Sequence, residues 1–110
     1  MSLPIDEDIL IQQLRDTKTR SNTFSALVNA YSEPLYWHIR RMVLSHEDAN
    51  DILQNTFIKA WQNIEYFRGD AKMSTWLYRI AFNECLTFLN HKRMEGQVSI
   101  NDIDTEILNK

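Results

Sequence analysis

One stripe of side chains in this sequence combines the chemistry that contacts nucleic acid. Trp76, Arg79, Asn83, Thr87 and Asn90 recur at three- and four-residue spacing, so a helix would place them on one face. An arginine can contact a phosphate or a guanine, an asparagine can read a base edge, and an indole can stack on an unpaired base. An indole near a helix start is also commonly a core side chain, so Trp76 has a structural interpretation beside the functional one.

Basic side chains flank this stripe. Arg68 and Lys72 precede it, Ser74 is the expected N-cap of its helix, and the run 91–93 (His-Lys-Arg) follows it. Acidic residues gather elsewhere in the sequence, in the ranges 6–8, 47–51 and 102–106. A chain with a net charge of −3 can therefore still present one basic face to DNA.

A second helical face is unusual for its amides and short carboxylates. It comprises Asp48, Asp51, Gln54, Asn55, Ile58 and Gln62. A solvated surface is the plain interpretation, but solubilising faces usually carry Lys and Glu, and the lone Ile58 suits contact with a partner. Asp48 and Asp51 also complement the positive end of the helix dipole, and in principle they could hold a divalent metal.

Helices must position both faces, because Gly and Pro number only two each, too few for the turns of an all-β fold. The sequence predicts an all-α bundle of about four helices, with a turn at Arg68-Gly69-Asp70 between the last two. Apolar periodicity places the helices at about 6–15, 23–44 with a kink or restart at Pro34, 47–65 with Ser45 as cap, and 74–93 before Gly96. Residues 1–95 are expected to form one domain, and the acidic, polar residues 96–110 a linker or tail.

The same periodicity predicts the core. The third helix is expected to bury Leu53, Thr56, Phe57, Ala60 and Ile64. The fourth helix is expected to be the central, most buried one through Leu77, Tyr78, Ala81, Phe82, Cys85, Leu86, Phe88 and Leu89. Phe57 and Leu86 should each be buried where these helices meet, and Cys85 should be an inert buried thiol.

Catalytic, metal and membrane chemistry is not expected. The three histidines are dispersed, no Cys/His cluster has ligand spacing, and no phosphate-binding glycine motif is present, so no enzyme, metal or cofactor is predicted. The single Cys85 excludes an internal disulfide and fits a reducing compartment. No stretch approaches the roughly 18 apolar residues of a membrane span, and the N-terminus lacks a signal-peptide pattern, so we expect a cytoplasmic protein.

Two long runs resemble a known family. Residues 48–61 (DANDILQNTFIKAW) resemble region 2.2, the polymerase-binding segment, of the extracytoplasmic-function sigma factors within the sigma-70 family. Residues 67–81 (FRGDAKMSTWLYRIA), followed by Asn83, resemble their promoter-recognition regions 2.3 and 2.4. The resemblance covers roughly 9–93. It implies a non-enzymatic subunit that binds core RNA polymerase and recognises and melts the promoter −10 element.

The resemblance also implies roles for residues. The second helical face would dock on the β′ clamp helices through Asp48, Asp51, Gln54, Asn55 and Ile58. Asp51 and Gln54 match the polar contacts of the family, and Asn55 stands where the family often has Glu. The loop before the fourth helix would capture a flipped base of the non-template strand, and Met73 stands in it where an aromatic or small residue is more usual. The implied DNA-binding set is Arg68, Lys72, Ser74, Trp76, Arg79, Asn83 and Thr87.

The resemblance further implies an anti-sigma factor as partner, and it leads us to expect that the −35-binding helix-turn-helix domain of full-length members is absent. Two other interpretations remain open. The chain could be a helical protein-interaction module without a DNA role, for which the stripe at Trp76, Arg79 and Asn83 would be superfluous. It could also be a metal-dependent helical enzyme that uses Asp48 and Asp51, in which case metal should stabilise it.

Overall fold

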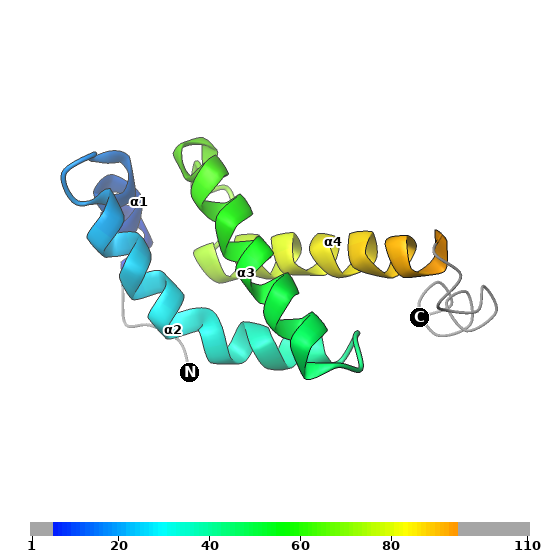
Figure 1. The fold of residues 1–110 in the computed structure, drawn as a ribbon. Helices are drawn as coiled ribbons and strands as arrows, with labels where there is room; N and C mark the ends of the chain where they lie inside the picture. Colours follow the sequence, from blue (N-terminus) through cyan, green and yellow to red (C-terminus); the bar gives the residue numbers. More distant parts are fainter. Residues whose placement is uncertain (1–5, 95–110) are drawn as a thin grey trace.

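Four α-helices and one short 3-10 helix make up the part of the protein that the computed structural model describes, residues 6–94 (Figure 1). Their bounds are α1 Glu7–Arg15, α2 Arg20–Arg40, α3 His46–Asn63, η1 Ile64–Tyr66 and α4 Met73–Met94. The prediction of an all-α bundle of about four helices is confirmed. The predicted helix end at Gly96 and the predicted linker at 96–110 lie outside the described residues.

Local capping residues start two of the helices as the sequence predicts. The Asp6 carboxylate accepts the backbone N–H of Asp8 at 2.8 Å and begins α1. The Ser45 hydroxyl accepts the N–H of Asp48 at 3.2 Å and begins α3. Both caps satisfy N–H groups that the first helical turn leaves without a carbonyl partner.

The start of α4 differs from the prediction. Ser74 was expected to be the N-cap, but the helix already begins at Met73, and Ser74 lies inside its first turn. The carboxylate of Glu7, in α1, accepts the Met73 N–H at 2.9 Å. The Ser74 hydroxyl instead lies close to the phenol of Tyr31 in α2. Ser74 as cap is therefore wrong, because a partner from a distant part of the chain satisfies the helix end.

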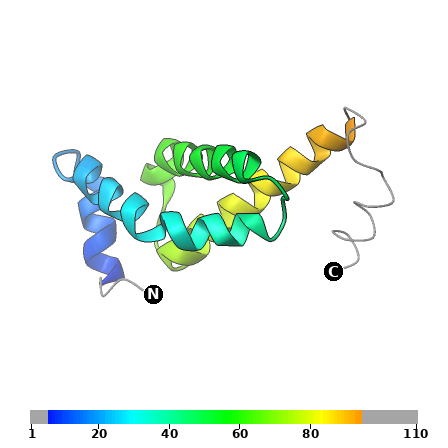
Figure 2. The ribbon, with the colours of Figure 1, turned by 60° about the horizontal axis from the view of Figure 1, so that its bottom comes forward.

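Pro34 bends α2 without ending it. Proline has no N–H, so the carbonyl one turn earlier loses its helical partner, while the helix continues from Arg20 to Arg40. The bend is visible near the middle of α2 in Figure 1 and again in Figure 2. As a result the first half of α2 lies beside α1, and its second half reaches α4, where His38 packs on Tyr78.

The buried face of α4 is narrower than predicted. Its fully buried side chains, Met73, Leu77, Ala81 and Cys85, follow each other at intervals of four. Of the other residues expected in its core, Tyr78, Leu86, Phe88 and Leu89 are half-buried and Phe82 is 43% exposed. The prediction that α4 is the central, most buried helix is wrong, because its second half extends beyond the other helices (Figures 1 and 2).

The core face of α3 is rotated slightly from the predicted one. Ala49, Ile52, Thr56 and Ala60 are buried, whereas the expected Leu53 and Phe57 are half-buried at its edge. The small alanines let neighbouring helices approach, and the Thr56 hydroxyl donates to the Ile52 carbonyl at 2.8 Å, so its burial leaves no unpaired hydroxyl.

Phe57 turns toward α2 rather than α4. Its ring meets Phe24 edge to face, with 6.4 Å between the ring centroids. The predicted burial of Phe57 where α3 and α4 meet is therefore wrong, and Leu86 is likewise only half-buried. The two aromatic rings gain their mutual contact where α2 passes α3, on the side of α3 away from its crossing with α4.

His38 is an ionisable side chain in the contact between α2 and α4. Its imidazole lies edge-on to the Tyr78 ring at 4.9 Å, and its Nε2 is buried without a hydrogen-bond partner. Burial, and next the positive charge of Arg41, lower the pKa of His38 from its ordinary 6.5. Protonation of this ring therefore opposes folding.

We predict that acid weakens the fold through this histidine. The unfolded chain binds a proton at His38 near pH 6.5, whereas the lowered pKa of the folded chain means that it binds this proton only at lower pH. The free energy of unfolding should therefore be unaffected by His38 above about pH 6.5 and should decrease as the pH falls below that value. Urea unfolding at pH 7.5 and 5.5 should show a smaller loss for His38→Phe than for the parent. Equal losses in the two proteins would contradict the prediction.

Candidate nucleic-acid interface

A groove of about 340 Å³ lies between the end of α3, the η1 turn and the middle of α4. The residues that line it are Lys59, Asn63, Tyr66, Trp76, Ile80, Asn83 and Glu84. It brings together Trp76 and Asn83, both predicted to contact DNA. Lys59 and Asn63 were missed, although they are four residues apart on α3 and thus share one side of that helix.

Trp76 satisfies both interpretations of its sequence position. It is half-buried and its ring tilts against the buried ring of Phe67, with 5.1 Å between the centroids. The same indole forms part of the groove wall. The contact with Phe67 holds the indole in place, so an unpaired base entering the groove would find an aromatic surface already ordered.

The other stripe residues lie at different distances from the groove. Asn83 is exposed at its wall. Thr87 is exposed one turn further along and donates its hydroxyl to the Asn83 carbonyl at 3.0 Å. Arg79 is exposed and does not line the groove. Of the stripe, the Asn83 amide and the Trp76 indole therefore line the groove, whereas the Arg79 guanidinium lies outside it.

The loop before α4 presents two further cations. Arg68 and Lys72 are exposed on either side of Gly69, whose φ of 81° lies in the left-handed region that favours glycine. Met73, expected in the loop pocket, is fully buried as the first residue of α4 and belongs to the core. Ser74, expected at the DNA, is half-buried against Tyr31.

The second predicted surface lies on the outer face of α3. Asp51, Gln54 and Asn55 are exposed, Ile58 is 52% exposed, and Asp48 is half-buried near the helix start. At about 100° per residue, this face points away from the core residues and adjoins the Lys59 side that lines the groove, since Asn55 precedes Lys59 by one turn. We call it the α3 outer face. One helix thus contributes to two adjoining polar surfaces.

An ion pair joins the two walls of the groove. Lys59 Nζ lies 3.3 Å from Glu84 Oε2, and the lysine side chain is 57% exposed while the glutamate is 13% exposed. Close by in α4, burial first and Glu84 second raise the pKa of the Cys85 thiol to about 11. The thiol is therefore protonated at neutral pH and takes no part in the groove's chemistry.

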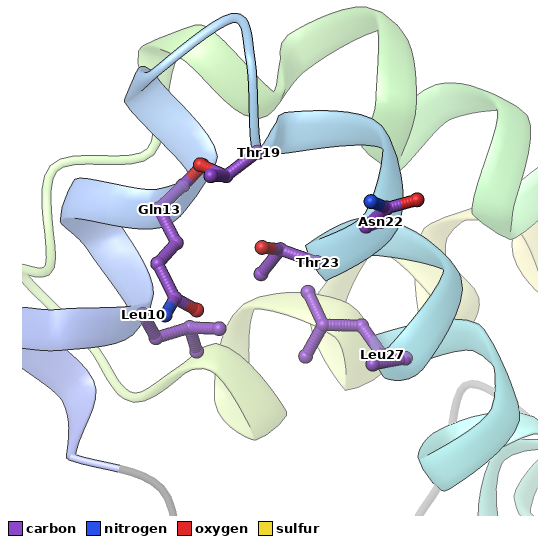
Figure 3. A pocket seen from close by; sticks show the side chains of 7 residues that line it. Leu10, Gln13, Thr19, Asn22, Thr23 and Leu27 are labelled. Atoms are coloured by element: carbon purple, nitrogen blue, oxygen red, sulfur yellow. The ribbon is translucent and has the colours of Figure 1, made fainter.

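A second hollow, of about 310 Å³, lies between α1 and α2 (Figure 3). Neutral side chains line it, namely Leu10, Gln13, Thr19, Asn22, Thr23, Ala26 and Leu27. None of the residues predicted to contact DNA or polymerase is among them. Within residues 6–94 no group of three or more His, Cys, Asp or Glu could hold a metal ion, and none of the helices there could cross a bilayer.

Comparison with known proteins identifies the family. A family model described as Sigma-70 region 2 matches residues 27–94, which include both surfaces. The chain belongs to the sigma-70 region 2 family. The predicted resemblance to this family is confirmed.

Its relatives include extracytoplasmic-function (ECF) sigma factors. The chain is 43% identical over 74 residues to the ECF RNA polymerase sigma factor SigG of Mycobacterium tuberculosis, a match of 67% of this chain and 20% of the relative. It is 34% identical over 89 residues to SigW of Bacillus subtilis, a match of 81% of this chain and 48% of the relative. The chain therefore spans less than half the length of these curated relatives.

A solved structure shares the fold of this sigma region 2 domain. An engineered region 2 of sigmaE, determined by NMR in complex with GTAAAA, superposes with a TM-score of 0.73 at 31% identity. The match covers 89% of this chain and all of that one.

We predict that the Lys59–Glu84 pair contributes little to stability. Glu84→Gln removes the charge but keeps the side-chain volume, and the largely exposed Lys59 can turn to water. The free energy of unfolding, measured in urea, should change by less than about 1 kcal/mol. A loss above about 2 kcal/mol would mean that the pair behaves as a buried one.

Proposed function

We propose that this chain is the part of a sigma factor that docks on core RNA polymerase through the α3 outer face and holds single-stranded −10 promoter DNA at the groove. The observation that carries the proposal is the meeting of Trp76 and Asn83 in one groove of a sigma-70 region 2 fold. Polymerase forms the phosphodiester bonds, and this chain supplies binding and strand capture.

The groove suits a base that has left the duplex. An unstacked base could lie on the Trp76 indole while the Asn83 amide contacts its edge. Extracting a base costs a few kcal/mol, and stacking in the groove would offset that cost. The relative bound to GTAAAA supports a short strand as the ligand.

Three exposed cations lie close to the groove residues in sequence and suit the backbone of such a strand. In the part of the chain that the structure describes, the side chains of Arg68, Lys72 and Arg79 have no hydrogen-bond or ion-pair partner. Their guanidinium and ammonium groups are therefore available to phosphates. Thr87, exposed beyond Asn83, would lie further along the same path.

Polymerase docking rests on the α3 outer face. Ile58 offers an apolar contact at its centre, and the exposed polar groups of Asp51, Gln54 and Asn55 surround it. A small apolar centre with a polar rim is the usual anatomy of a protein interface. The family resemblance supplies the partner, the β′ clamp helices. It also suggests an anti-sigma factor, to which we assign no surface.

The rival interpretations explain less. A protein-interaction module has no need of an ordered indole beside an amide in a groove. A metal-dependent enzyme at Asp48 and Asp51 would require a third ligand, and residues 6–94 supply none that forms a group with them.

We predict that changes on the α3 outer face weaken docking without unfolding the domain. Asp51→Lys, or Gln54→Ala combined with Ile58→Ala, should reduce the affinity for a β′ clamp-helix fragment by at least about 1.5 kcal/mol. Glu65→Lys, an exposed charge reversal in η1, is the control. Unchanged affinity of the double variant in a titration would reject this face as the docking surface.

We predict that the chain prefers a −10 single strand over the matching duplex. Fluorescence anisotropy would use single strands that vary GTAAAA one base at a time, a scrambled strand and the duplex. Asn83→Ala should reduce discrimination at one base, and Arg79→Ala should weaken all strands evenly. The salt slope should be shallow, about −0.7 per phosphate neutralised. Equal affinity for all strands and the duplex would exclude specific readout.

A further inference from the structure

The first turn of α1 is attached to the first turn of α4. Glu7 Oε1 accepts the Met73 N–H at 2.9 Å across 66 residues of sequence. Met73 is fully buried, and its N–H is one of those that a helix start leaves without a carbonyl. A carboxylate at this place satisfies the N–H and complements the positive end of the α4 dipole.

The next turn of α1 is attached to the loop before α4. A Cβ placed on Gly69 would come within 2.5 Å of the Ile11 side chain, so the loop backbone lies directly on that residue. Ile11 follows Glu7 by four residues, so both side chains project from the same side of α1. One face of α1 therefore contacts both the loop and the helix that carry Lys72 and Trp76.

The other end of α1 is fixed to α2. The Thr19 hydroxyl donates to the Gln13 carbonyl and the Arg20 Nε donates to the Leu14 carbonyl, each at 2.6 Å. Figure 3 shows Thr19 beside Gln13 where the chain returns into α2. Leu10 and Leu14 are buried in the core. Because α1 is secured at both ends, it can hold the loop in one position relative to α2.

A tyrosine of α2 lies in the same region. The Tyr31 phenol is close to the Ser74 hydroxyl in the first turn of α4 and to Glu7. The start of α4 is therefore held from α1 through Glu7, and Tyr31 of α2 lies beside it. Trp76 lies in the same turn, and its N–H donates to the Lys72 carbonyl at 3.0 Å.

We propose that α1 is a brace for the DNA-binding groove and that Glu7 is its positioning residue. Glu7 keeps the first turn of α4 formed, which places Lys72 and the Trp76 indole before DNA arrives. The strand then binds without first ordering them, and such pre-organisation raises affinity. The inference rests on the proposed function and assigns a role to α1, which lies before the segment matched by the family model.

The test compares Glu7→Ala, Glu7→Gln and the control Asp8→Ala in the full chain. Asp8 is exposed in the same turn, and Asp8→Ala removes the same charge, but within residues 6–94 no hydrogen bond or ion pair joins Asp8 to α4. Each protein is titrated with the best-bound −10 single strand and with the β′ clamp-helix fragment, and amide hydrogen exchange is followed at Met73.

Glu7→Ala should bind the strand about fivefold more weakly, the size expected for loss of a helix cap. Its affinity for the clamp fragment should be unchanged and its Met73 amide should exchange faster. Glu7→Gln, which keeps an oxygen acceptor, should lose less. The direction is diagnostic, because removing a negative charge would by itself strengthen DNA binding, as Asp8→Ala should show slightly.

The proposal is overturned if the Met73 amide of Glu7→Ala exchanges no faster than in the parent, or if it exchanges faster while the strand is bound as well as by Asp8→Ala. Should Glu7→Ala not fold, Glu7→Gln decides alone by the same comparison. Failure of the proposed function has a different signature. The parent would then show no preference for the −10 strand, whereas the Met73 exchange rates would still report whether Glu7 holds α4.

Discussion

Burial of one narrow stripe on α4 is the constraint on which the rest of the structure depends. Met73, Leu77, Ala81 and Cys85 fill the core at intervals of four, and the small Ala81 and Cys85 let α4 cross close to its neighbours. Half-buried apolar side chains such as Tyr78 and Ile80 flank this stripe, so the opposite arc of the helix remains available for polar side chains. The groove forms beside the crossing, where α3 supplies the opposite wall through Lys59.

The helix α3 serves three purposes with three of its sides. Its alanines and Ile52 pack in the core, Lys59 and Asn63 line the groove, and the α3 outer face is exposed. Because the helix is rigid, its rotation of about 100° per residue fixes the directions of these sides relative to one another. A partner bound to the outer face would therefore hold the groove at a fixed orientation relative to itself.

The fold was predictable because many of its determinants lie within a few residues of the helices that they shape. The features that the sequence did not predict depend on contacts between residues far apart in the chain. Asp6 and Ser45 act within three residues of their own helices, so sequence spacing reveals them. The carboxylate that caps α4 comes from Glu7, and no sequence pattern near the start of α4 indicates this partner. The α3 core face was misplaced by one position because Ile52 and Leu53 are equally apolar, and only packing distinguishes them. The groove residue Lys59 was missed for a similar reason, since its place depends on how α3 crosses α4.

The placement of the three tryptophans has an optical consequence. Trp37 is exposed on α2, Trp61 packs on Phe24 at 5.1 Å, and Trp76 lines the groove. A base stacked on an indole quenches its emission, and only one of these indoles lies in the groove. With Trp37 and Trp61 replaced by phenylalanine, the tryptophan emission of the chain would come from Trp76 in the groove alone and report strand entry without any attached dye.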